Sequence, residues 1–209
     1  MPGMACRALS ESEVVKVYNA LGGVNAKRNR AMFVFGLYAG FRIGEILSAK
    51  VSDVINPEGF NDEITLKETK TGKMRTVKMS EQLRLILKPW IDERMSTGLM
   101  LFTDYLFCKS GGEKMTYIQA WKILRAAYSK AGVRGRVATH SMRKTFAQRM
   151  LQLFSSEAKP GDSWNVLKET QKATGHSSLK SLEHYLPDSE EKTLAAEEKY
   201  GAKIIIGGK

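Results

Sequence analysis

The stretch EITLKETKTGKMRTVKM, residues 63–79, determines the predicted fold class. Apolar and polar side chains alternate over residues 63–67 and again over residues 75–79, which is typical of half-buried strands. Thr71-Gly72 lies between the two runs, and a glycine there favours the turn of a β-hairpin. The remaining chain shows helical patterns. The sequence therefore predicts a mainly α fold with a small antiparallel β-sheet, an α+β class.

Helices are predicted on both sides of this hairpin from capping residues at their starts and from glycine or proline at their ends. Ser10 and Glu13 form a capping-box pattern ahead of a helix that ends at Gly22-Gly23. Asn25 is the expected cap of a second helix, which stops near Gly40. Further helices are expected over residues 42–50, from Ser80 to a kink or end at Pro89, from Thr116 to Gly132, and over residues 140–154, 164–174, 178–185 and 189–200. Residues 155–163 are expected to form an exposed loop.

Composition limits the classes of protein to be considered. The chain has 209 residues, which suits one ordinary domain, and 43% are hydrophobic, enough for a core. Lysine and arginine total 33 against 22 acidic residues, and the net charge of +11 favours an acidic partner, with nucleic acid as the first candidate. Cys6 and Cys108 are too few and too far apart for a disulfide framework or a zinc site. With no apolar run long enough for a bilayer and no secretory pattern, a soluble intracellular protein is expected.

Four short segments carry side chains that could take part in catalysis. Each has an ordinary structural explanation when taken alone, such as a surface ion pair between Arg42 and Glu45 or a solvated turn around Lys70. The segments are GFRIGE at 40–45, TKTGK at 69–73, THSMR at 139–143 and GHSS at 175–178, with Tyr185 nine residues after His176. Together they supply two arginines, a lysine, two histidines and a tyrosine. His176 is expected at a helix N-terminus, where backbone N–H groups favour anions.

This set of side chains suits transesterification of a phosphodiester without a metal ion. Arginine forks can hold the non-bridging oxygens, and imidazoles can add hydrogen bonds and move protons. A lysine can protonate the departing 5′-hydroxyl, and a tyrosine can be the nucleophile of a covalent intermediate. A free phenol has a pKa of about 10 and needs a cationic pocket and a base at neutral pH. No aspartate cluster suits two Mg²⁺ ions, which disfavours a metal nuclease, and no metal or cofactor is expected.

The four segments occur in the order of the boxes of the tyrosine recombinase (phage integrase) family, which the chain resembles from about residue 8 to residue 187. The resemblance implies the fold of that family's catalytic domain and a site-specific recombinase that acts through a 3′-phosphotyrosine and a Holliday junction. The catalytic residues that it implies are Arg42, Lys70 (with Lys73 as the fallback), His140, Arg143, His176 and the nucleophile Tyr185, with Glu45 as a structural partner. Ser141-Met142 replaces the commoner acidic-leucine pair, with little expected effect.

The resemblance also implies a domain organisation. Residues 1–187 are expected to form the catalytic domain, without the separate N-terminal core-binding domain that usually completes the clamp around DNA. Residues 188–209 are expected to form a polar helix and an apolar tail, Ile204–Ile206, that is exchanged between protomers. The stretch 152–172 is longer than usual, and its 155–163 loop is a candidate contact for DNA or a partner.

The implied partner is double-stranded DNA, bound by a homotetramer on synapsed sites and by a monomer in free solution. Accessory DNA-bending or directionality proteins fit this activity, and no membrane contact is expected. The implied location is the cytoplasm, at the nucleoid, in a bacterium, phage or other mobile element. DNA phosphate contacts are expected from Lys73, Arg75, Arg134, Arg136 and Lys144.

Two other functions share this pattern. A type IB topoisomerase-like or telomere-resolving enzyme would use the same nucleophile, and the topology of products from a two-site plasmid separates it from a recombinase. A non-catalytic DNA-binding regulator would bind nicked suicide DNA without forming a covalent complex. All six polar positions are occupied, which favours the enzyme.

Overall fold

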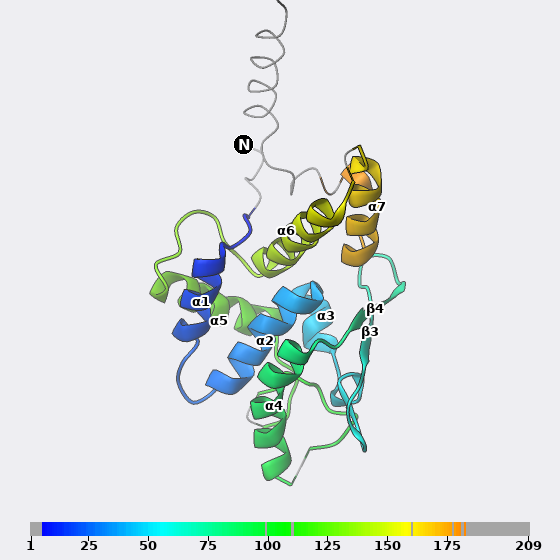
Figure 1. The fold of residues 1–209 in the computed structure, drawn as a ribbon. Coiled ribbons are helices and arrows are strands. Elements are labelled where there is room, and N and C mark those ends of the chain that lie inside the picture. Colours follow the sequence, from blue (N-terminus) through cyan, green and yellow to red (C-terminus); the bar gives the residue numbers. More distant parts are fainter. Residues whose placement is uncertain are drawn as a thin grey trace, which may run out of the picture.

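The fold is mainly helical, as predicted, with small antiparallel sheets. The computed structural model describes residues 6–98, 100–109, 111–159, 161–176, 178–180 and 182. Within them lie helices α1 (Glu11–Ala20), α2 (Ala26–Ala39), α3 (Ile43–Ser48), α4 (Glu81–Ser96), α5 (Tyr117–Lys130), α6 (His140–Glu157) and α7 (Ser163–Thr174), a 3-10 turn η1 (Val51–Asp53), and strands β1 (Ile55–Asn56), β2 (Gly59–Phe60), β3 (Glu63–Lys67) and β4 (Met74–Lys78) (Figure 1). The expected helix over 189–200, the apolar tail and Tyr185 lie outside the described residues.

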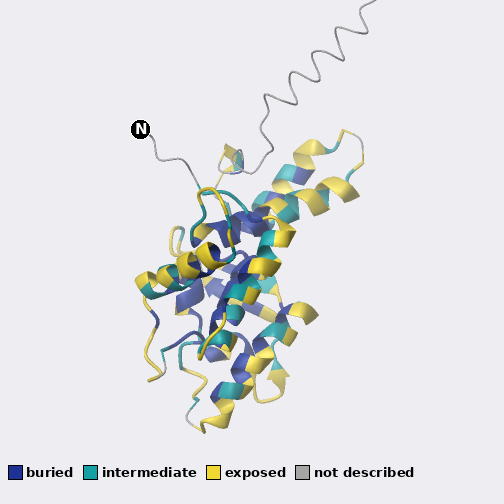
Figure 2. Ribbon diagram, turned by 90° about the vertical axis from the view of Figure 1, so that its left-hand side faces the viewer, coloured by how far each residue is buried: buried dark blue, intermediate teal, exposed yellow. Residues whose placement is uncertain are grey.

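Helix α2 occupies the centre of the molecule and supplies much of its core. Met32, Phe33, Phe35 and Leu37 are all buried, and α2 packs against α3, α4 and α6. The buried residues gather in the middle of the molecule (Figure 2). The Phe35 ring stacks on that of Phe41 with 6.1 Å between centroids. Burial of each such side chain is worth about 1.5–3 kcal/mol. The helix that ends just before Arg42 is therefore anchored along its length.

Capping residues set several helix boundaries where the sequence predicted them. The Ser10 hydroxyl accepts a hydrogen bond from the Glu13 backbone N–H at 3.3 Å, and the Glu13 carboxylate accepts one from the Ser10 N–H at 2.9 Å. This reciprocal pair confirms the predicted capping box at α1. Helices α2 and α7 both end on left-handed glycines, Gly40 (φ 62°) and Gly175 (φ 65°). These two glycines turn the chain directly into the motifs that follow them.

The predicted hairpin is present, and its register decides which side chains face the interior. β3 pairs with β4 from Glu63↔Lys78 to Lys67↔Met74, so the second strand begins one residue earlier than expected. Ile64 and Leu66 are buried on β3. Because Leu66 pairs with Arg75, the register places Arg75 on the same buried face.

Two boundaries differ from the prediction. Helix α4 continues through Pro89 to Ser96. Pro89 has no backbone N–H, so the Leu85 carbonyl has no hydrogen-bond donor within the helix. Leu85 and Pro89 both lie on the exposed face of α4, where water can donate to that carbonyl. Helix α6 extends to Glu157, so most of the expected 155–163 loop is a short link in an antiparallel α6–α7 pair (Figure 1). Among the described residues, no helix is both long and apolar enough to cross a bilayer.

Candidate active site

Arg42 and Glu45 form the ion pair expected from their spacing. Arg42 precedes the first turn of α3, and its Nη1 donates to Glu45 Oε1 at 3.0 Å while its backbone N–H donates to Oε2 at 2.8 Å. The same Glu45 Oε1 accepts from both the backbone N–H and the hydroxyl of Thr69 at 3.1 Å. Burial acts to raise the pKa of Glu45, but these hydrogen bonds and the Arg42 charge outweigh it and lower that pKa. Glu45 therefore stays ionised and joins Arg42 to the hairpin loop.

The hairpin loop presents its lysines to solvent and keeps its carboxylate inside. Lys70 and Lys73 are exposed, whereas Glu68 is 4% exposed. The Thr71 hydroxyl donates to Glu68 Oε2 at 2.7 Å, and the Glu68 carboxylate lies 3.9 Å from Arg42 Nη1. The loop that carries Lys70 is thus tied at its base to the side chains around Arg42.

Arg143 lies in the interior, one turn into α6 from His140. It is 1% exposed, and its guanidinium donates to two backbone carbonyls, from Nη1 to Gly40 at 2.8 Å and from Nη2 to Thr174 at 2.7 Å. These carbonyls lie at the C-terminal ends of α2 and α7. Such ends carry partial negative charge and unsatisfied acceptors, which stabilise a buried cation.

His176 follows the C-terminal end of α7, and the helix expected after it, over residues 178–185, lies partly outside the described residues. Its ring Nδ1 lies 2.5 Å from the Thr174 hydroxyl, which itself donates to the Thr170 carbonyl at 2.6 Å. Because the hydroxyl proton is used in that bond, His176 Nδ1 is the donor to Thr174, and Nε2 of the neutral ring is left as the acceptor. Thr174, which lies outside the predicted motifs, thus contacts the His176 ring.

The electrostatics show that four of the predicted residues, Arg42, His140, Arg143 and His176, lie close together. Burial and the charges of Arg143, Arg42, His140 and Arg75 lower the pKa of His176 to about 3. Burial and the charges of Arg143, Arg42 and Lys144 lower the pKa of His140 as well. Both imidazoles are therefore neutral at pH 7 and lie beside several cationic side chains. An anion bound next to these cations would favour protonation of the imidazoles.

The predicted DNA contacts divide into exposed and buried residues. Arg134 and Arg136 are exposed in the link before α6, and Lys73 is exposed on the hairpin loop. Arg75 is 7% exposed, and its guanidinium bonds backbone carbonyls and lies 3.9 Å from the Phe41 ring centroid. Lys144 is 8% exposed. Arg75 and Lys144 are therefore buried in the DNA-free protein, and their contact with DNA phosphates stays a prediction.

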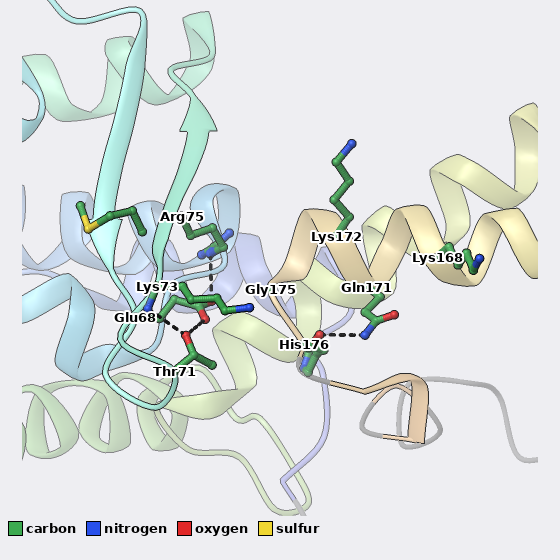
Figure 3. Close-up of a pocket in the computed structure, with 10 residues that line it drawn as sticks. Glu68, Thr71, Lys73, Arg75, Lys168, Gln171, Lys172, Gly175 and His176 are labelled. Carbon is green, nitrogen blue, oxygen red and sulfur yellow. Dashed lines mark hydrogen bonds and ion pairs between the residues drawn. The ribbon is translucent and has the colours of Figure 1, made fainter.

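A groove beside the site combines Lys73, a predicted DNA contact, with two lysines of α7 that were not predicted to contact DNA. It has a volume of about 640 Å³ and lies between the hairpin loop and α7, with His176 and Gly175 in its wall (Figure 3). Lys73, Lys168 and Lys172 line it. Lys168, Lys172 and His176 follow one another at intervals of four residues, a spacing that could have placed both lysines on the side of α7 that leads to the histidine.

The depressed pKa of His176 predicts a loss of stability in acid. The pKa is about 3 in the folded protein against 6.5 in the reference state, so the unfolded chain binds a proton that the folded chain does not. Its contribution to the free energy of unfolding is complete above pH 6.5 and is lost as the pH falls toward 3.

Urea midpoints measured from pH 7 to pH 4 test this expectation with a His176→Gln variant. The wild-type midpoint should fall more steeply than that of the variant. Glu13 and Glu45, whose pKa values are also lowered, destabilise both proteins in acid, so the difference between the curves isolates His176. Parallel curves would show that the imidazole is not shielded from protonation.

Comparisons with known proteins agree on one family. The model of the phage integrase family matches residues 7–192. The chain is similar to the probable integrase/recombinase YoeC of Bacillus subtilis, at 31% identity, over 93% of this chain and 95% of that protein. It is similar to tyrosine recombinase XerC of Chromobacterium violaceum, at 31% identity, over 76% of this chain but 47% of XerC. The crystal structure of XerA recombinase aligns with a TM-score of 0.69 at 26% identity, covering 94% of this chain and 66% of XerA.

Proposed function

The chain belongs to the phage integrase family, and from that premise we propose that it is a site-specific DNA recombinase that cleaves and rejoins strands through a phosphotyrosine at Tyr185. One observation carries the proposal. Two arginines and two neutral imidazoles, from sequence positions 42 to 176, form one cluster, in which burial and the arginine charges lower the pKa of both histidines. Gathering positive charge in a partly buried place costs folding free energy, so such a cluster is expected to serve an anionic ligand.

The cluster suits each step of an in-line phosphoryl transfer. The Tyr185 oxygen attacks phosphorus, the bond from phosphorus to the 5′-oxygen breaks, and the phosphate stays on the tyrosine as a 3′-phosphotyrosine. His140 accepts the phenol proton, and Lys70, on the exposed loop, gives a proton to the 5′-oxygen. Arg42, which is 22% exposed, holds the non-bridging oxygens. Attack by a 5′-hydroxyl reverses the reaction, so no cofactor is needed.

Arg143 and His176 complete the stabilisation of the transition state. Arg143, placed by two helix ends, adds a second fixed positive charge near the same oxygens. His176 is held by Thr174, and a bound phosphate would raise the depressed pKa of its ring and so favour a proton on Nε2. The direct test is incubation with nicked suicide DNA. A covalent complex on a denaturing gel supports the enzyme, whereas DNA binding without a complex supports a regulator.

The basic groove between the hairpin loop and α7 is proposed to bind the DNA backbone next to the cleaved phosphate. We expect a Lys168→Ala/Lys172→Ala double variant to lower the slope of log K against log salt by about 1.8, because each phosphate contact contributes about 0.9. A Lys16→Ala/Lys130→Ala variant is the matched control, since both lysines are exposed on α1 and α5, away from α7 (Figure 1). Equal slopes for the two variants would remove the groove from the DNA interface.

The proposed recombination joins two DNA sites in a tetramer and passes through a Holliday junction. The exchange of residues 188–209 between protomers belongs to this proposal, and those residues lie outside the described part of the chain. The chain spans about half the length of XerC, so the assembly and substrates of the whole protein are proposed here together with the reaction.

A further inference from the structure

Two arginines fasten the same pair of helix ends together. Arg143 bonds the carbonyls of Gly40 and Thr174, and Arg75 bonds the preceding carbonyls, Ala39 from Nη2 at 2.8 Å and Ala173 from Nη1 at 3.2 Å. Each guanidinium therefore reaches the last turn of α2 with one nitrogen and the last turn of α7 with another. A planar fork can do this, whereas a lysine ammonium is a single point on a flexible stem.

The two helix ends lead directly to residues of the proposed active site. Arg42 comes two residues after Gly40, and His176 comes one residue after Gly175. The Arg75 guanidinium also stacks on the ring of Phe41, which lies between Gly40 and Arg42. The distance between α2 and α7 at this point therefore sets the distance between Arg42 and His176.

The contact between the hairpin and α7 leaves little room for adjustment. A Cβ built on Gly175 would lie 2.2 Å from Glu68 Oε1 and 2.8 Å from Arg75 Cδ. Glu68 lies 3.6 Å from Arg75 Nε and 3.9 Å from Arg42 Nη1, and it accepts the Thr71 hydroxyl next to Lys70 (Figure 3). The buried Glu68 carboxylate thus connects Arg75 and Arg42 to the loop that carries Lys70, the proposed proton donor.

We infer that Arg75 is a positioning residue that, with Glu68, holds Arg42, His176 and the Lys70 loop in place before DNA binds. This inference rests on the proposed function. It replaces the expected phosphate contact of Arg75 with a role inside the protein. Arg75 touches neither DNA nor the reacting atoms, so its loss should lower the rate of cleavage without weakening DNA binding.

The experiment measures the rate of covalent complex formation at saturating DNA, and separately the DNA dissociation constant. Arg75→Lys should lower the rate about 100-fold, the size expected for a misplacement of about 1 Å in a catalytic group, while the dissociation constant stays within about threefold. The matched control is Arg94→Lys. Arg94 is 8% exposed, bonds the Tyr105 carbonyl at 2.7 Å and lies on α4, away from α7 (Figure 1), so its variant should keep the wild-type rate.

A second variant tests the connection to the Lys70 loop. Thr71→Val removes the hydrogen bond to Glu68 from a half-buried side chain and should slow cleavage about tenfold. A DNA with sulfur at the 5′-bridging position does not need a proton donor, because a thiol leaves far more readily than an alcohol. On this DNA the Thr71→Val variant should recover the wild-type rate, and Arg75→Lys should stay slow because Arg42 and His176 remain displaced.

The outcomes separate the inference from the proposed function. If the folded Arg75→Lys protein, checked by urea unfolding beside Arg94→Lys, cleaves within about threefold of wild type, the positioning role is wrong. The positioning role is also wrong if Arg94→Lys slows cleavage as much as Arg75→Lys does. It is wrong as well if Thr71→Val still cleaves slowly the DNA with sulfur at the 5′-bridging position. If the wild-type protein itself forms no covalent complex, the proposed function fails first and the inference falls with it.

Discussion

Replacing Tyr185 with phenylalanine is expected to abolish the covalent DNA complex and to leave DNA binding unchanged. Phenylalanine has no oxygen with which to attack phosphorus, so the rate should fall by about 10⁴-fold or more. The two arginines and two imidazoles of the cluster remain in place in this variant, and they, with the basic groove, should still hold the DNA. Denaturing gels with suicide DNA measure the first quantity, and gel shifts measure the second.

A Tyr18→Phe variant is the control for this experiment. Tyr18 lies on α1, where its ring is 5.0 Å from the Arg30 guanidinium, and loss of its hydroxyl should leave complex formation unchanged. An adduct that persists in Tyr185→Phe would assign the nucleophile to another residue. Loss of DNA binding together with the adduct would mean that the substitution damaged the fold, which thermal unfolding of the variant would reveal.

A Gly40→Ala substitution is expected to lower the free energy of unfolding strongly. A Cβ at this position would lie 2.0 Å from Cδ1 of Phe146, a ring that is 6% exposed and cannot move aside freely. The backbone φ of 62° adds about 1–2 kcal/mol of strain for any residue with a Cβ. Overpacking adds about 1–3 kcal/mol, so we expect the free energy of unfolding to fall by about 2–5 kcal/mol.

Gly132→Ala is a closely matched control. Gly132 has a φ of 67° and nothing within 4 Å of a built Cβ, so only the backbone strain applies to it. Urea unfolding should therefore show a clearly smaller loss in Gly132→Ala than in Gly40→Ala. Equal losses would mean that the Phe146 ring rearranges at no cost. Because Arg143 bonds the Gly40 carbonyl, Gly40→Ala should also slow cleavage under conditions where the variant remains folded.

The acid branch of the stability curve and the salt dependence of DNA binding examine different parts of the same site. The first depends on how the cations and the surrounding protein shield His176 in the free protein. The second depends on how many lysines of the groove meet DNA phosphates. Agreement of the second with expectation would place the DNA backbone in the groove between the hairpin loop and α7 (Figure 3).

Local sequence was sufficient to predict most of the secondary structure. The alternation in residues 63–67 predicted a strand, and Ser10 with Glu13 predicted the start of α1, because strand periodicity and capping depend on neighbours a few residues apart. The prediction that a helix kinks or ends at Pro89 was wrong. Proline has a low helix propensity, but the helix continues because Pro89 lies on its solvent-exposed face. Local reasoning also ended α6 too early, because pairing with α7 extends that helix.

By itself the sequence determined which side chains are candidates for phosphodiester chemistry, and in what order they occur, because those boxes are short and contiguous. Only the tertiary structure decided that Arg75 turns inward and joins two helix ends. Its partners, Ala39 and Ala173, lie 36 and 98 residues away along the chain, so no local pattern records them. The depressed pKa of His176 has the same origin, since burial and cations from distant segments produce it.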